Sequence, residues 1–270
     1  MAQPGSVEKR AVAYLDVLGF RELLRTTPLA KLGAQYDRMV AQTEAQNRPF
    51  PLGVPVPTLF PEHPVNAPLC RRYVFSDSII LLSNTPAIVD CLKLLVYAWR
   101  FHQSLLASGF PTRGAVAYDD LYENPQTNVV LGKALTTAYE LEQAQQWIGV
   151  AVDKSVEPLL YLVPPVIAQY RNLLDTVFWS YPVPLKDGRT VTLRTFNWRF
   201  NLIVEKGTKS LFRVSQEPSA RAKVENTLAY AKAVIQSVAA YVTPMENVPV
   251  ELRRYFVGAK KPPFDHGDEL

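Results

Sequence analysis

Residues 11–20 read AVAYLDVLGF, an apolar run that carries one carboxylate near its end and a Gly-Phe pair after it. Its β-branched and aromatic residues favour a strand, where an Asp is costly unless it is solvated, paired or bound to a metal. Gly19 allows a sharp turn, so that the neighbouring amides would face a ligand at the start of the next helix, an arrangement that suits phosphate. Asp16 is therefore either a solvated strand end or a ligand-binding carboxylate.

The composition is that of a globular protein. Of 270 residues 48% are apolar and 20% are charged, which suits one large domain or a core with an appended unit. The net charge is +4, but Lys and Arg do not gather into one stripe, so we expect no nucleic-acid partner. Cys70 and Cys91 lack metal-ligand spacing and are expected to be reduced thiols. A polar N-terminus and the lack of a long apolar run predict a cytoplasmic protein without membrane contact.

Periodicity, turn residues and prolines divide residues 1–153 into alternating elements. A strand ending at Asp16 precedes a helical pattern that Pro28 interrupts. Residues 48–68 contain seven prolines and are expected to form either an extended arm over a partner subunit or a solvent-exposed insertion. The other expected elements are a hairpin at 71–82 with Ser76 and Asp77 at its turn, a helix from 84–86 to 108, a strand at 111–118 ended by Asp119 and Asp120, a short strand at 129–131, a helix at 132–146 and a strand at 148–152.

The order of these elements predicts an α+β fold with a ferredoxin-like βαββαβ core. Helices would cover one face of a mainly antiparallel sheet and leave the other face for a ligand or a partner. Residues 154–270 would form a C-terminal α/β extension that packs on the core or on a dimer partner. Its expected elements are a helix within 156–175, strands at 177–183 and 190–196, and a long helix at 217–241.

Two carboxylates are predicted to meet at one end of this sheet. Asp16 ends the first strand, and Asp77 lies in the turn of the hairpin that should pair beside it. Two carboxylates brought together repel each other and need a counter-charge, most simply a divalent metal such as Mg²⁺ or Mn²⁺. Two such ions could activate an attacking hydroxyl and stabilise a triphosphate. The alternative is that Asp77 is only a turn residue, as Asp often is.

Four segments resemble motifs of one protein family, the class III nucleotidyl cyclases. Residues 16–20 look like that family's first metal-binding motif, Asp-x-x-Gly-Phe. The others follow in the family's order: FSDS at 75–78 resembles the hairpin motif, RGAVAY at 113–118 the Arg-containing strand, and LGKALTTAYELE at 131–142 the helix with the transition-state residues. Three segments, FSDS at 75–78, AYELE at 138–142 and VPLKDG at 183–188, resemble one branch of the family in particular. This branch is the bacterial Pycsar pyrimidine cyclases, which make cyclic UMP or cyclic CMP in response to phage.

The resemblance implies a role for each matching position. Asp16, Asp77 and the carbonyl of Val17 would hold two divalent ions, Mn²⁺ or Mg²⁺. The backbone amides after the first Asp would cradle the β- and γ-phosphates; these belong to Leu18, Gly19 and Phe20.

Two further side chains would contact the substrate. Arg113 would bind the triphosphate, or else form an ion pair with an acidic neighbour. Tyr73 stands where purine cyclases place a base-reading Lys or Glu, and it would stack on or hydrogen-bond to a pyrimidine. Its alternative is a core aromatic of the hairpin.

The sequence departs from the family in its catalytic helix. Thr136 aligns with the catalytic Asn and could still donate a hydrogen bond to the ribose. Glu140 aligns with the transition-state Arg and cannot stabilise developing negative charge. A cation must therefore come from elsewhere, and the candidates are Lys133, Arg71 and Arg72.

The resemblance thus implies a cyclase that converts UTP to cyclic UMP and pyrophosphate as a homodimer, with each site between two protomers. The alternatives are a cytidylate cyclase that uses CTP, a degenerate cyclase fold that only binds nucleotide as a regulator, and a structural dimerisation module.

Overall fold

The computed structural model describes residues 5–44, 67–161, 177–197 and 218–240. The proline-rich stretch expected at 48–68 therefore lies, except for its last two residues, outside the described residues. The same holds for most of the helix expected within 156–175.

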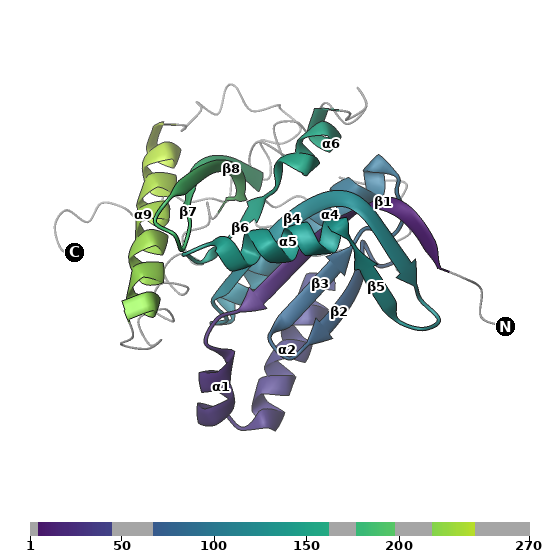
Figure 1. Cartoon of the computed structure of the whole chain (residues 1–270). Coiled ribbons are helices and arrows are strands. Elements are labelled where there is room, and N and C mark those ends of the chain that lie inside the picture. The colour runs from purple at the N-terminus through teal and green to yellow at the C-terminus, as the bar shows by residue number, and fades with distance from the viewer. Residues whose placement is uncertain (1–4, 45–66, 162–176, 198–217, 241–270) are drawn as a thin grey trace, which may run out of the picture.

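The eight strands of the described residues form one mixed sheet with the order β2-β3-β1-β4-β6-β8-β7, and β5 pairs with β4 outside this path (Figure 1). Their bounds are β1 Ser6–Val17, β2 Arg71–Phe75, β3 Ser78–Leu82, β4 Thr112–Asn124, β5 Val129–Gly132, β6 Gly149–Val152, β7 Phe178–Pro184 and β8 Thr190–Phe196.

The first four strands of the path have the predicted ferredoxin-like arrangement. β1 lies between β3 and β4 and is antiparallel to both, and β2 closes this side of the sheet as a hairpin with β3. β6 then pairs parallel to β4, and β8 pairs antiparallel to β6. The α+β fold class is therefore confirmed, and the sheet continues from the core strands into the C-terminal strands. The division into a core and an extension at 153/154 stays a prediction.

The helices follow the expected order with one early start corrected. A break at Pro28 separates α1 from α2, as predicted. α4 begins at Ile88 and not at 84–86, because Thr85 Oγ1 accepts a hydrogen bond from the Ala87 amide (3.1 Å) in a turn before the helix. The bounds are α1 Phe20–Thr26, α2 Leu29–Glu44, α4 Ile88–Ala107, α5 Lys133–Ala144, α6 Glu157–Tyr161 after the 3-10 turn η1 Lys154–Val156, and α9 Pro218–Ala240.

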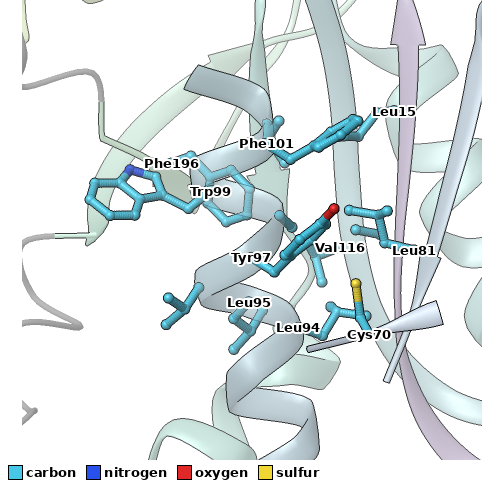
Figure 2. Packing of buried hydrophobic residues seen from close by; sticks show 14 of the residues in the cluster. Leu15, Cys70, Leu81, Leu94, Leu95, Tyr97, Trp99, Phe101, Val116 and Phe196 are labelled. Carbon is cyan, nitrogen blue, oxygen red and sulfur yellow. The ribbon is translucent and has the colours of Figure 1, made fainter. Parts of the chain in front are cut away.

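The main core lies between the sheet and α4. Alternate residues of β1 point to this side and pack against fully buried aromatic and aliphatic residues of the helix (Figure 2). The members drawn and labelled in Figure 2 are Leu15, Cys70, Leu81, Leu94, Leu95, Tyr97, Trp99, Phe101, Val116 and Phe196. This core fixes which residues of β1 face the opposite side.

The opposite face of the sheet is not left open, which corrects our expectation. α5 packs across β1 and β4 on that side, where Val12, Leu82 and Leu121 contact Ala134 (Figure 1). β4 is also longer than expected and continues past Asp119 to Asn124. Lys9 on β1 lies opposite Asp120 and forms ion pairs with both aspartates, which lets the acidic pair remain in a strand.

A second cluster joins the C-terminal elements to the core. The rings of Trp147, Tyr181 and Tyr230 pack together, with Tyr230 edge-on to both of the others. Val183 and Leu193 of the β7–β8 hairpin belong to the same cluster. None of the described helices is both long and apolar enough to cross a membrane.

Candidate active site

The end of β1 and the β2–β3 turn meet, as predicted. Asp16 pairs with Ser78 in the β1–β3 register, and the Val17 amide donates a hydrogen bond to the Asp77 carbonyl (2.9 Å). The turn contains only two residues, of which Ser76 has a left-handed backbone (φ 57°). The structure therefore brings Asp16 and Asp77 to the same end of the sheet.

The face on which Asp16 lies follows from the alternation of β1. Leu15 and Val17 point into the α4 core, so that Tyr14 and Asp16 face the side of α5. Tyr14 confirms this direction, because its hydroxyl bonds to Ser78 Oγ (2.8 Å) and its ring lies edge-on to Tyr139 of α5. Asp16 is half-buried at the edge of this contact.

Asp16 is partly desolvated and lies among charges of both signs. The pKa of Asp16 is raised to about 6, chiefly by burial and also by the charges of Glu142 and Asp77, against the opposing effect of Arg113 and Lys223. A carboxylate in this position is stabilised by a cation that binds it directly. The electrostatics of the site therefore favour cation binding at the end of β1.

The donor set fits a divalent metal that keeps other ligands. Asp16 and Asp77 are hard oxygen donors of the type that Mg²⁺ and Mn²⁺ prefer. Within the described ranges, no group of three or more His, Cys, Asp or Glu side chains is placed to hold a metal ion. A metal here would be completed by backbone oxygens, water or substrate phosphates, as is usual for nucleotide-bound Mg²⁺.

The turn after β1 has the conformation expected of Gly19 but commits one of the three amides. Gly19 caps α1 with a left-handed backbone (φ 72°, ψ 15°). The Leu18 amide donates to the Pro111 carbonyl (2.7 Å), so this contact takes the place of its expected phosphate contact. Roles for the Gly19 and Phe20 amides stay predictions.

Arg113 forms the ion pair that was its alternative interpretation. Arg113 is only 3% exposed, and its Nε and Nη2 both lie 2.5 Å from Oε1 of the fully buried Glu142. Nη1 donates to the Gln145 carbonyl (2.8 Å). All three nitrogens are thus engaged by α5 and the residue after it, and a contact with triphosphate stays a prediction.

Tyr73 likewise packs as a hairpin aromatic. It pairs with Ile80 and shares the α5 face with Val12 and Leu82. Because the turn has two residues, Tyr73 and Ile79 lie on opposite sides of the hairpin. Its hydroxyl donates to Glu123 Oε1 (3.1 Å), and a contact with a pyrimidine base stays a prediction.

The outer side of α5 is exposed. Thr136 is exposed and donates through Oγ1 to the Gly132 carbonyl (3.2 Å), and Glu140 is exposed one turn later. Neither residue approaches Asp16 through an interaction within the described part of this chain. Thr136 therefore keeps its catalytic role only as a prediction, as a residue presented outward.

The cations expected near the site are engaged elsewhere. Arg71 forms an ion pair with Glu123 (2.6 Å), and Arg72 binds Glu44 and the Tyr97 hydroxyl. Both lie on the end of β2 that is remote from Asp77. Lys133 is exposed at the start of α5, and its charge interacts with that of Asp119.

Two lysines that the sequence did not single out lie near the carboxylates instead. The charges of Lys186, from the β7–β8 turn, and Lys223, from α9, both interact with those of Asp16 and Glu142. No sequence motif marks Lys223. Lys186 lies in the segment VPLKDG at 183–188, but its position in the sequence did not predict that it would lie near Asp16 and Glu142.

No family model matches the sequence, and no curated protein matches it. Similar solved structures include the catalytic core of a rhodopsin-guanylyl cyclase with converted specificity in complex with ATPalphaS, at 11% identity and a TM-score of 0.48, over 72% of this chain and 98% of that chain. They also include the adenylyl cyclase CyaB from P. aeruginosa, at 13% identity and a TM-score of 0.45, over 72% of this chain and 96% of that chain. Because both TM-scores lie below 0.5, the similarity assigns neither a family nor an activity to the chain.

Proposed function

We propose that this chain is a pyrimidine nucleotide cyclase that converts UTP to cyclic UMP and pyrophosphate. Cyclic UMP would serve as a second messenger in anti-phage defence. The motifs that resemble class III cyclases support the reaction, and those similar to the Pycsar branch support the pyrimidine substrate and the defence role. The observation that carries the proposal is the convergence of Asp16 and Asp77 at one end of the sheet, where burial and neighbouring carboxylates raise the pKa of Asp16 to about 6.

In this reaction the ribose 3′-oxygen attacks the α-phosphate in line, and the bond from the α-phosphorus to the bridging oxygen breaks as pyrophosphate leaves. Asp16, Asp77 and the Val17 carbonyl would hold two divalent ions, Mn²⁺ or Mg²⁺, which lower the pKa of the attacking hydroxyl and neutralise the leaving group. The Gly19 and Phe20 amides would bind the phosphates at the turn after β1. The proton of the 3′-hydroxyl passes to solvent water.

A homodimer would complete the site. Thr136 and Glu140 are exposed on α5, and Tyr139 between them is 46% exposed. Phe75, at the hairpin tip, is 63% exposed, although it is a large aromatic residue. A second copy that covers these side chains could present its Thr136 to the ribose bound beside the first copy's Asp16.

Two other outcomes are open for the substrate and the activity. CTP differs from UTP at position 4 of the base, so a cytidylate cyclase requires only different contacts there. A nucleotide-binding regulator without turnover is favoured by one observation, namely that the exposed face of α5 carries Thr136 and Glu140 where the resembled motif has Asn and Arg.

The test is incubation of the purified full chain with each of four nucleoside triphosphates and Mn²⁺, followed by chromatography of the products. We expect cyclic UMP from UTP. Asp16→Ala and Asp77→Ala should each lower the rate by about a hundredfold or more, because each removes a ligand of the ions that stabilise the transition state. Asp37→Ala is the matched control, since Asp37 is exposed on α2.

Cyclic CMP as the main product would replace the substrate but keep the reaction. Nucleotide binding without any cyclic product would favour the regulator. A folded protein that neither binds nor converts any of the four nucleotides would contradict the proposal and leave a structural dimerisation module.

A further inference from the structure

The N-terminal half of α9 is held against the segment that follows α5. Thr227 Oγ1 accepts a hydrogen bond from the Ile148 amide (2.9 Å), and Asn226 Nδ2 donates to the Gln146 carbonyl (2.7 Å). Thr227 Oγ1 also donates back to the Lys223 carbonyl (2.6 Å), one helical turn earlier. The position of the Lys223 backbone is therefore set by hydrogen bonds of α9 to the segment between α5 and β6, and not by the Lys223 side chain.

The β7–β8 turn is anchored at the same place. The Lys186 amide donates to the carbonyl of Ala144, the last residue of α5 (2.8 Å), and the Gln146 amide donates to the Pro184 carbonyl (2.8 Å). Glu142, the partner of Arg113, lies two residues before this anchor. Both lysines are thus placed beside the C-terminal end of α5.

Apolar contacts extend this arrangement to the end of β1. Leu185 and Val224, the sequence neighbours of the two lysines, pack in one cluster with Leu18. Leu18 follows Asp16 by two residues in the chain. The C-terminal elements therefore share a hydrophobic cluster with Leu18, just after the strand end that carries the proposed metal-binding carboxylate.

The ammonium groups of Lys186 and Lys223 have no direct partner among the described residues. In the part of the chain that the structure describes, neither Lys186 nor Lys223 forms a salt bridge or a side-chain hydrogen bond. Arg113, in contrast, forms a buried ion pair with Glu142. Lys223 is half-buried, and burial and the neighbouring positive charges of Arg113 and Lys186 lower its pKa. A half-buried cation that has no ion pair among the described residues, and whose charge interacts with that of Asp16, is suited to an anion that also binds a metal at Asp16.

We propose that Lys223 binds the terminal phosphates of the nucleotide held at Asp16 and Asp77 of the same chain, with Lys186 beside it. This inference rests on the proposed function and extends it. It gives α9 a purpose, because the helix supplies positive charge in place of Arg113. It also explains how a chain with Glu140 in its catalytic helix can still neutralise the leaving pyrophosphate, since a lysine is an effective point charge for phosphate.

The experiment measures binding by calorimetry with two probes, Mn²⁺–UTP and Mn²⁺–tripolyphosphate, on the full chain. Three variants are compared with wild type. Lys223→Gln removes the charge, Lys223→Arg keeps it, and Lys232→Gln is the matched control because Lys232 is exposed further along α9. We expect Lys223→Gln to weaken both probes by about tenfold, the loss of one charge-assisted contact. Lys223→Arg should remain within about threefold of wild type, and Lys232→Gln should be unchanged.

Two other outcomes would overturn the inference, and a third would separate it from the cyclase proposal. Equal affinities of Lys223→Gln and wild type for both probes would contradict it while leaving the cyclase proposal intact. Weaker UTP binding with unchanged tripolyphosphate binding would assign Lys223 to the base or ribose instead. If wild type binds both probes and Lys223→Gln weakens both, but no cyclic product forms, the lysine proposal survives and the cyclase proposal fails.

Discussion

Two buried glutamates lie on the same face of the sheet, at opposite ends of α5, and they are compensated differently. Glu123, on β4 near the start of α5, is met by Arg71 (2.6 Å), by Arg10 (3.4 Å) and by the Tyr73 hydroxyl (3.1 Å). This cluster holds one carboxylate between two guanidinium groups and a donor. Its partners close it, so it has no need of a ligand.

Glu142, at the other end, belongs to a cluster that is not closed. Its partner Arg113 is satisfied, but Asp16 and Asp77 add two carboxylates. Lys186 and Lys223 add two ammonium groups that form no direct ion pair within the described ranges. Carboxylates and ammonium groups therefore lie in one cluster without direct contact between them. The comparison teaches that burial of ions does not by itself indicate a functional site. A buried cluster indicates one when some of its charged groups remain unpaired.

The largest expected effect comes from breaking the closed pair inside the open cluster. Glu142→Gln should lower the free energy of unfolding by about 3 kcal/mol, because it leaves Arg113 buried without its carboxylate. This value lies at the lower end of the cost of breaking a buried ion pair, because the Asp16 carboxylate remains opposite Arg113 in the β1–β4 register. Urea denaturation at fixed protein concentration measures the change.

Glu123→Gln is the matched comparison at the other end of α5. It should cost less, about 1–2 kcal/mol, because Arg10 keeps its bonds to the Ser83 and Asn84 carbonyls and Arg71 can turn to solvent. A larger loss for Glu123→Gln than for Glu142→Gln would contradict the distinction between the two clusters.

A smaller effect of opposite sign is expected for Asp16→Asn. The pKa of Asp16 is raised from 3.8 to about 6, so the folded state favours the protonated carboxyl. Its contribution to stability is complete below about pH 4 and is lost as the pH rises through about 6. At pH 7 Asp16→Asn should therefore stabilise the metal-free protein by about 1 kcal/mol, after allowance for its partial exposure.

Thermal or urea unfolding at pH 7 and pH 4 checks this prediction, since the gain should vanish at the lower pH. Mn²⁺ should stabilise wild type at pH 7 and not Asp16→Asn. Destabilisation by Asp16→Asn in the absence of metal would show that Asp16 is already compensated within the fold.

The sequence predicted what local patterns determine. Pro28 ends α1, and the Ser76–Asp77 turn closes the hairpin, because turn residues and prolines restrict the backbone wherever they occur. Strand order followed from the succession of elements, and with it the meeting of Asp16 and Asp77. These are constraints that a short segment carries by itself.

The failures lie where distant segments decide. Asp119 and Asp120 did not end β4, because Lys9, from another strand, pairs with both. The open face expected for a ligand is covered by α5, which periodicity could not assign to one side of the sheet. Lys223 is placed near Asp16 by hydrogen bonds and apolar contacts of α9 with distant segments, and no spacing along the chain predicts such contacts.

The smallest expected effect separates the two interpretations of Tyr73 in the closed cluster. Tyr73→Phe keeps the ring against Val12 and Leu82 and removes only the hydroxyl that donates to Glu123. We expect a loss of about 1 kcal/mol in the free energy of unfolding, the value of one hydrogen bond to a carboxylate that retains its other partners. The measurement is urea denaturation together with kcat/KM for UTP and for CTP.

Because the hydroxyl is already engaged, the ratio of kcat/KM for the two pyrimidines should not change, and any contact of Tyr73 with a base would be through its ring. A changed ratio would mean that the hydroxyl leaves Glu123 and reads the base when nucleotide binds. In that case the Glu123 cluster would no longer be closed, and the contrast between the two ends of α5 would hold only for the nucleotide-free protein.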